Sequence, residues 1–137
     1  MRRALSTILL SCLLVTSASG CKTTVQAATE APALGSDATI VAKKNKTGTY
    51  AVSIEVLNLA PASRLDPGAA TFVVWFVAKD APAVRAGELA YDEGDRLGRL
   101  EATSPNGQFH VLITLEKEAS PASPNGKGIL DVPITAR

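Results

Sequence analysis

Alternating apolar and polar positions recur along the chain from residue 37 onward. Every second residue is apolar from Tyr50 to Val56 and again from Phe109 to Leu115. A period of two is typical of a strand with one buried face, and short apolar runs bounded by turn residues also favour strands. These patterns predict strands at 38–42, 50–57, 70–78, 89–91, 97–100, 109–116 and 128–135.

The run 70–78 differs because it is apolar at both parities. Such a strand lies in the centre of a sheet, or a loop covers its second face. We expect Phe72, Trp75 and Phe76 to anchor the core. Pro133 indicates an edge strand or the end of a strand, because proline cannot donate to a ladder.

Turn signals separate these segments. Residues 58–68 contain two prolines and predict an irregular connection, and Asp92–Asp95 predicts a hairpin turn. Ser-Pro-Asn-Gly occurs at 104–107 and again at 123–126, in surroundings that do not match. About seven short strands with turns between them predict an all-β fold, an immunoglobulin-like antiparallel β-sandwich with Trp75 on its third strand.

The start of the chain has a different pattern. Met1–Arg3 is basic, Ala4–Val15 is largely apolar, and Thr16–Gly20 consists of small residues before Cys21. A basic start, an apolar middle and a small-residue exit predict a secretory signal. The apolar run is shorter than the roughly 20 residues that a membrane span needs.

Ala18-Ser19-Gly20-Cys21 resembles the cleavage site of bacterial lipoproteins. The resemblance implies a thioether-linked diacylglycerol and an N-acyl chain, such as palmitate, on Cys21. Lys22, in place of the Asp that retains many lipoproteins in the inner membrane, implies the outer membrane of the cell envelope. Two alternatives stay open: the box Leu9–Cys12, which leaves a very short apolar segment, and ordinary cleavage after Gly20, which leaves a free thiol.

The predicted organisation is a signal peptide at 1–20, the lipidated Cys21 with a flexible tether at 21–36, and a β-sandwich at 37–137. Residues 22–36 are rich in Ala and Thr without a useful period, which favours a tether. Alternatively, the tether packs on the domain as an edge segment near Val25 or Leu34. With Cys12 removed and Cys21 acylated, the sandwich depends on its core alone.

The distribution of charge along the sequence limits the classes of partner that we expect. The 14 basic and 13 acidic residues nearly balance, and no long run has one sign. The nearest cluster is Lys43-Lys44-Asn45-Lys46, which is typical of a solvated turn. This pattern argues against a nucleic-acid partner. The sequence has no P-loop, dinucleotide-binding loop or Cys/His cluster, so we expect no cofactor.

Candidate chemistry is sparse. His110, the single histidine, alternates out of phase with the apolar positions and should face outward. Because a catalytic site is hard to build around one outward histidine, we expect that the protein is not an enzyme. Asp92, Glu93 and Asp95 are candidate calcium ligands, but they lack EF-hand spacing and favour a solvated hairpin tip with no metal. Glu116 and Glu118 would share a face only if their strand continued.

Four segments of the domain resemble the extracytoplasmic domain of anti-sigma-K-type regulators. They are Phe72-Val73-Val74-Trp75, Gly87-Glu88-Leu89, the strand from Phe109 to Glu116, and the loop into a last strand from Pro121 to Leu130. The resemblance implies the fold only. The regulators carry a cytoplasmic helical domain and a transmembrane helix, for which this sequence shows no counterpart, so sigma-factor binding does not follow.

The sequence therefore predicts a non-enzymatic envelope lipoprotein, held at the membrane by lipid on Cys21, whose sandwich is a binding or structural module for an envelope protein. The alternative is an envelope sensor domain for a small ligand or a metal ion. Small sandwiches bind through end loops or free edges, which here means 58–68, 79–85, 117–126 or the edge near Pro133.

Overall fold

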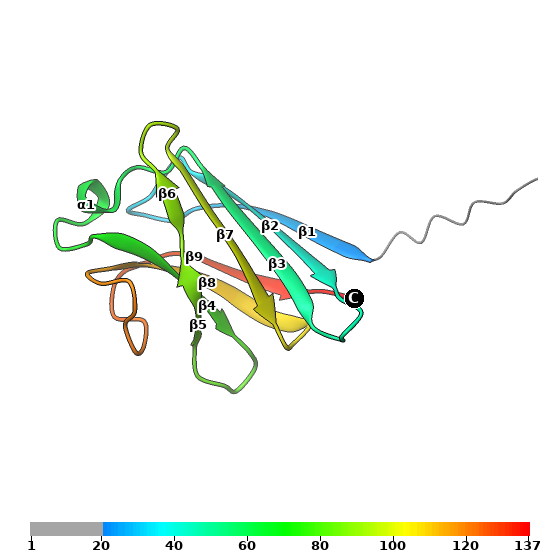
Figure 1. Ribbon diagram of the computed structural model, residues 1–137. Helices are drawn as coiled ribbons and strands as arrows, with labels where there is room; N and C mark the ends of the chain where they lie inside the picture. Colours follow the sequence, from blue (N-terminus) through cyan, green and yellow to red (C-terminus); the bar gives the residue numbers. More distant parts are fainter. Residues whose placement is uncertain (1–20) are drawn as a thin grey trace, which may run out of the picture.

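The computed structural model describes residues 21–137, so the predicted signal peptide and Cys12 lie outside the described residues. Nine strands and one turn of helix make up this range (Figure 1). They are β1 (Lys22–Ala28), β2 (Asp37–Lys44), β3 (Tyr50–Leu57), α1 (Ala62–Leu65), β4 (Thr71–Val77), β5 (Val84–Glu88), β6 (Ala90–Asp92), β7 (Leu97–Ser104), β8 (Gln108–Glu116) and β9 (Gly128–Thr135).

The strands form two antiparallel sheets packed face to face. One sheet has the order β1-β2-β3-β7-β6 and the other has the order β5-β4-β8-β9. Immunoglobulin domains pair their first, second, fifth and fourth strands against their third, sixth and seventh strands. Here β2-β3-β7-β6 faces β4-β8-β9 in that arrangement, with β5 added beside β4 and β1 added beside β2. The predicted immunoglobulin-like sandwich is confirmed, and Pro133 does lie on an edge strand.

The core lies between the sheets and is built by the alternating positions. Its aromatic centre pairs Phe76 of β4 with Phe109 of β8, at 4.9 Å between ring centroids. Phe72 packs in a similar tilted pair with Tyr91 of β6, at 5.6 Å. The largest fully buried side chains around them include Ile40, Ile54, Leu59, Ile113, Leu115, Ile129 and Ile134.

Trp75 is placed differently from our expectation. It is fully buried, but it does not belong to the inter-sheet core, where Phe72, Val74 and Phe76 represent β4. Since side chains alternate along a strand, Val73 and Trp75 face the opposite side of the four-stranded sheet. The expectation that Trp75 anchors the core between the sheets, as the tryptophan of an immunoglobulin domain does, is therefore wrong.

The expectation of a flexible tether at 21–36 is also wrong. Residues 22–28 form β1, which pairs with β2 along its full length, from Lys22 opposite Lys43 to Ala28 opposite Asp37. Val25 and Ala27 pack against the core. The alternation was faint because the inward residues are Thr, Val and Ala, whose small apolar surface hardly exceeds that of their neighbours. The alternative of a packed edge segment near Val25 describes β1 correctly.

The connection from β1 to β2 is held in place as well. The Thr29 hydroxyl donates to the carbonyls of Ala33 and Ser36, at 2.5 and 3.1 Å, and the Ser36 hydroxyl donates to the carbonyl of Asn58 at 3.0 Å. Thr29, Ala33 and Ser36 are buried, whereas Leu34 is exposed. The domain thus begins directly after Cys21.

The strand directions define two ends of the sandwich (Figure 1). We call the first the Cys21 end, because β1 begins there. The strand registers place three connections at this end: the β2–β3 turn, the β4–β5 loop and the β7–β8 turn. At the second, the far end, lie the β1–β2 connection, the segment around α1, the β6–β7 turn and the β8–β9 loop.

Candidate functional site

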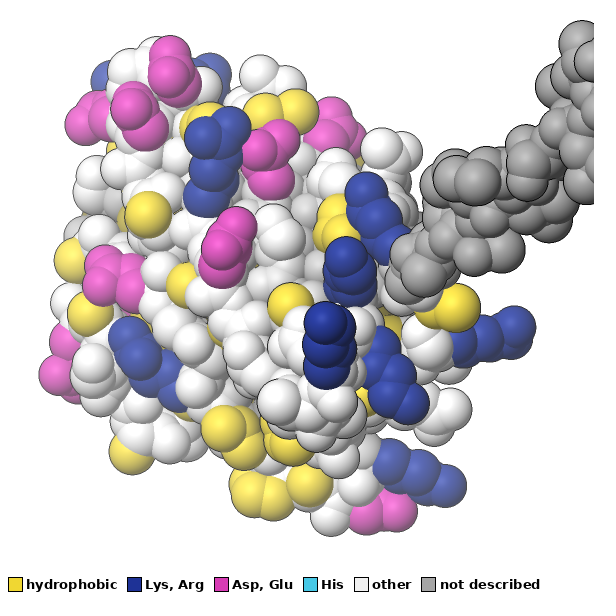
Figure 2. All heavy atoms as spheres, turned by 45° about the vertical axis from the view of Figure 1, so that its right-hand side comes forward, with side chains coloured by type: hydrophobic (Ala, Val, Ile, Leu, Met, Phe, Trp, Pro, Cys, Tyr) yellow, Lys and Arg dark blue, Asp and Glu magenta, His cyan; other side chains and the backbone are white. Residues whose placement is uncertain are grey.

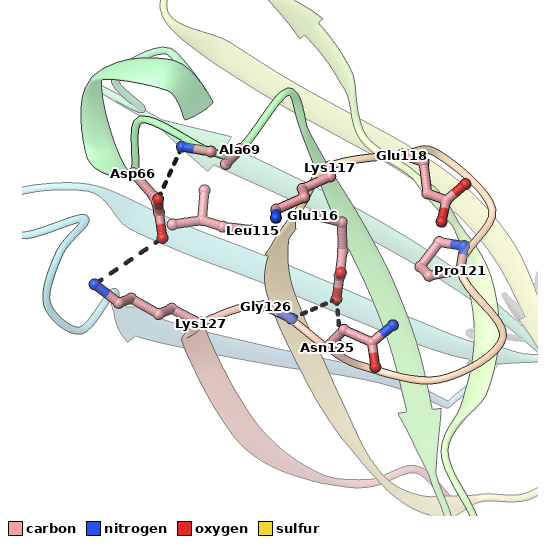
Figure 3. A pocket seen from close by; sticks show the side chains of 11 residues that line it. Asp66, Ala69, Leu115, Glu116, Lys117, Glu118, Pro121, Asn125, Gly126 and Lys127 are labelled. Carbon is pink, nitrogen blue, oxygen red and sulfur yellow. Dashed lines mark hydrogen bonds and ion pairs between the residues drawn. The ribbon is translucent and has the colours of Figure 1, made fainter.

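The β8–β9 loop, residues 117–127, folds back over the outer face of the four-stranded sheet (Figure 3). The apolar outer face of β4 explains this path, because Val73 and Trp75 would otherwise meet water. The loop reaches across to β5, where Arg85 Nε donates to the carbonyl of Ala119 at 2.8 Å. The second covered face that the sequence predicted for β4 is therefore confirmed, and its cover is this loop.

A chain of hydrogen bonds connects the loop to the sheet beneath it. Trp75 Nε1 donates to Thr114 Oγ1 at 2.9 Å, and the Thr114 hydroxyl donates to Glu116 Oε1 at 2.7 Å. The same carboxylate oxygen accepts the backbone N–H groups of Asn125 and Gly126, at 3.0 and 3.1 Å. Glu116 is only 4% exposed. A buried carboxylate with these partners holds the loop against the sheet, since charge-assisted hydrogen bonds are stronger than neutral ones.

Gly126 makes the loop's close approach possible. A Cβ atom at this position would lie 1.4 Å from the carbonyl oxygen of Leu115, which is a backbone atom of β8. A residue with a side chain therefore cannot follow this path unless the loop moves away from the strand. The register of the β8–β9 pairing shifts just before this contact: Ile113 pairs with Leu130, but Thr114 pairs with Gly128, so β9 carries one extra residue where it leaves the loop.

Between the loop and the segment after α1 is a hollow of about 360 Å³ (Figure 3). Asp66 and Ala69 line it from the α1 side, and Glu116, Lys117 and Lys127 line it from the loop side. Lys127 Nζ lies 4.0 Å from Asp66 Oδ2, so a loose ion pair connects the two sides of the hollow. Asp66 Oδ1 in turn accepts the backbone N–H of Gly68 at 3.0 Å.

The hollow offers both signs of charge to a small ligand. The carboxylates of Asp66 and Glu118 and the ammonium groups of Lys117 and Lys127 line a space that could accommodate a small polar molecule. Glu116 Oε1 already accepts three hydrogen bonds, so this oxygen serves the loop. Charged groups of both signs in such a hollow are able to orient a polar ligand.

The predicted site residues are found at several separate places. His110 is exposed on β8, as expected, and its Nδ1 lies 2.7 Å from Asp131 Oδ1 on β9. Asp92, Glu93 and Asp95 are exposed at the β6–β7 turn, where the Asp92 carboxylate accepts the backbone N–H of Asp95 at 3.0 Å. No group of three or more His, Cys, Asp or Glu side chains within residues 21–137 is arranged to hold a metal ion.

Glu116 and Glu118 do not form a pair on one strand face. β8 ends at Glu116, which is buried, whereas Glu118 is exposed in the loop. The condition for a shared face, that the strand continue, is not met.

Tyr91 lines a second hollow, beside α1 and β4. Its hydroxyl donates to the carbonyl of Leu59 at 2.5 Å, and burial raises the pKa of Tyr91 above its usual value. The phenol therefore stays protonated at neutral pH and serves as a structural donor.

Two of the candidate binding loops meet at the hollow. Residues 58–68 and 117–126 come together at the far end, whereas residues 79–85 lie at the Cys21 end. Asp66 and Lys127 were not recognised as site residues from the sequence. The sequence signals them only through their positions: Asp66 lies within residues 58–68, and Lys127 directly follows residues 117–126. The two loops come together only because of the order of strands in the sheets.

No protein-family model, no curated protein and no solved structure matches this chain. No helix among residues 21–137 is long and apolar enough to cross a membrane.

Proposed function

We propose that this protein is a bacterial envelope lipoprotein, anchored through lipid on Cys21, whose immunoglobulin-like sandwich is a non-enzymatic binding module. One observation carries the proposal: Cys21 is exposed and directly precedes β1 at one end of the sandwich, whereas the hollow and two candidate loops lie at the other end. An anchor at Cys21 thus leaves the far end free for a partner.

The size of the domain supports this division. A strand rises about 3.3 Å per residue, so the seven residues of β1 separate the two ends by roughly 23 Å. With two or more acyl chains the attachment is stable. The far end then stands clear of the membrane surface, where an envelope protein can reach it.

Acyl labelling in cells tests the anchor. We expect label on the wild type, none on Cys21→Ala and full label on Cys12→Ala. Label that survives Cys21→Ala and disappears in Cys12→Ala would move the anchor to the other box. An unlabelled wild type would show that the protein is not a lipoprotein.

Crosslinking in the intact envelope tests the binding module. A photoreactive residue at position 118, on the rim of the hollow, should capture one envelope protein in good yield. The same residue at position 53, exposed on the outer face of the five-stranded sheet, is the matched control. Equal capture of abundant proteins from both positions would argue against a binding surface at the far end.

The hollow favours a second candidate, an envelope sensor domain for a small polar ligand. A screen of small zwitterions and anions by thermal unfolding tests it. A ligand of this site should raise the melting temperature of the wild type, and the rise should be smaller in Lys117→Gln. A screen with no shift, or a shift unaffected by this substitution, would count against the site.

A further inference from the structure

The charges of the sandwich are segregated between its two ends. The basic residues at the Cys21 end come from separate parts of the sequence and are all exposed: Lys22, Lys43, Lys44, Lys46, Lys79 and Arg137. The strand registers bring them together: Lys22 pairs with Lys43, the β2–β3 turn carries Lys46, and Gln108, at the start of β8, pairs with Thr135 near Arg137. We call these six residues the basic end.

The space-filling view shows the same distribution (Figure 2). Lys and Arg side chains gather around the place where the described chain begins, and Asp and Glu side chains gather at the opposite, upper part of the molecule. Acidic residues outnumber basic ones at the far end, where the β6–β7 turn alone carries Asp92, Glu93 and Asp95. The acidic residue that lies within the basic end is Asp80, next to Lys79.

The side chains of the basic end are free to meet an external anion. The ion pairs among residues 21–137 use Arg99, His110 and Lys127 as their basic members, so none of them involves the basic end. Unpaired, exposed cations on one surface produce a positive field that attracts anionic surfaces.

The position of Cys21 identifies the surface that the basic end would meet. Since β1 begins at Lys22 and is paired from its first residue, no linker separates Cys21 from the sandwich. The six basic residues lie at the same end of the sandwich as Cys21, and packed sheets lie only about 10 Å apart. When the acyl chains on Cys21 hold this end at a bilayer, basic residues on both sheets therefore lie within roughly one Debye length of its surface.

We propose that the basic end is a docking surface for the anionic headgroups of membrane phospholipids. The contact keeps the sandwich upright on the bilayer and points the hollow at the far end away from it. The proposal rests on the proposed anchor for the place of the bilayer, but the electrostatic contact itself can be measured without any acyl chain.

Co-sedimentation with vesicles tests the docking surface. The protein is residues 21–137, which contain both sheets and the whole core, with Cys21→Ser to prevent acylation. We expect binding to vesicles of equal phosphatidylcholine and phosphatidylglycerol, no binding to phosphatidylcholine alone, and release by salt. The triple variant Lys43→Gln, Lys44→Gln, Lys46→Gln should bind roughly a hundredfold more weakly, at about fivefold per lysine.

A matched control carries the same change of charge at the far end: Arg64→Gln, Lys117→Gln, Lys127→Gln. It should bind nearly as well as the parent protein, and thermal unfolding verifies that both triple variants are folded. If the two triple variants weakened vesicle binding equally, the net charge of the protein would explain the binding, and the proposal would be overturned. Binding that ignores phosphatidylglycerol, or that is directed to an anionic polysaccharide instead, would also overturn it.

Acyl labelling separates this proposal from the anchor. A protein that is labelled on Cys21 but shows no lysine-dependent vesicle binding keeps the anchor and overturns the docking surface. A protein that binds the vesicles through these lysines but carries no acyl chain keeps the docking surface and overturns the anchor.

Discussion

The same four residues, Ser-Pro-Asn-Gly, form two turns that are held in different ways. Residues 104–107 join β7 of one sheet to β8 of the other, and the buried Ser104 hydroxyl donates to the carbonyl of Asn106 at 2.8 Å and accepts its N–H at 3.2 Å. In residues 123–126 the corresponding Ser123 is exposed, and the backbone N–H groups of Asn125 and Gly126 donate to Glu116.

A turn sequence thus specifies a bend but not the partners of its backbone. In the first turn, the serine satisfies the backbone of its own asparagine. The second is held by a carboxylate of the preceding strand, and so it brings a whole loop down onto the sheet. Buried backbone N–H groups must find an acceptor, and the surroundings determine which acceptor is nearest.

The largest effect should come from the glycine of the second turn, and the glycine of the first turn is its comparison. Gly126→Ala places a methyl group 1.4 Å from a backbone oxygen, so the loop must detach, and we expect a loss of more than about 3 kcal/mol. Gly107→Ala meets the Tyr50 hydroxyl at 2.8 Å and the Ala136 carbonyl oxygen at 3.1 Å, a much smaller overlap with the backbone, and we expect about 1–2 kcal/mol. Urea unfolding measures both, and similar losses would refute the close approach.

The next effect should come from removing the acceptor of the second turn, Glu116. Glu116→Ala leaves two backbone N–H groups and Thr114 without their acceptor, so we expect a loss of about 2–3 kcal/mol. Because the loop covers Trp75, the tryptophan fluorescence should also shift to the red in the folded variant. Glu118→Ala, in the same loop but exposed, is the control and should change neither stability nor emission.

Retention of the wild-type emission in Glu116→Ala would show that Glu116 does not hold the loop. Glu116→Gln sharpens the test, because the amide oxygen still accepts hydrogen bonds but carries no charge. We expect it to recover about half of the lost stability, since hydrogen bonds to charged groups are about twice as strong as neutral ones.

The strands that could be predicted from the sequence are those whose inward residues differ strongly from their neighbours. The strands β3 and β8 alternate large apolar residues with polar ones, and the structure follows the pattern. The strand β1 was missed because Thr23, Val25 and Ala27 bury little apolar surface each. Its stability comes from pairing with β2, a long-range contact that no local pattern reveals.

The candidate site was predictable only in part. The apolar outer face of β4 correctly indicated a covering loop, and residues 58–68 and 117–126 were already candidate binding loops. The role of Glu116 was not visible, because its partners Asn125 and Gly126 come from the far part of a loop whose path depends on Trp75 beneath it. The convergence of lysines at the Cys21 end likewise follows from strand register, which the sequence does not state.

The smallest effect should separate the two serines that begin the turns. Ser104→Ala removes a buried hydroxyl that makes both hydrogen bonds to Asn106, so we expect a loss of about 1 kcal/mol. Ser123→Ala removes an exposed hydroxyl whose nearest partner, Asn125 Oδ1, lies at 3.4 Å, and the free energy of unfolding should stay within about 0.5 kcal/mol of wild type. Thermal unfolding of the two variants side by side measures the difference. If Ser123→Ala cost as much as Ser104→Ala, the second turn would also depend on its own serine, and Glu116 would not be what holds it.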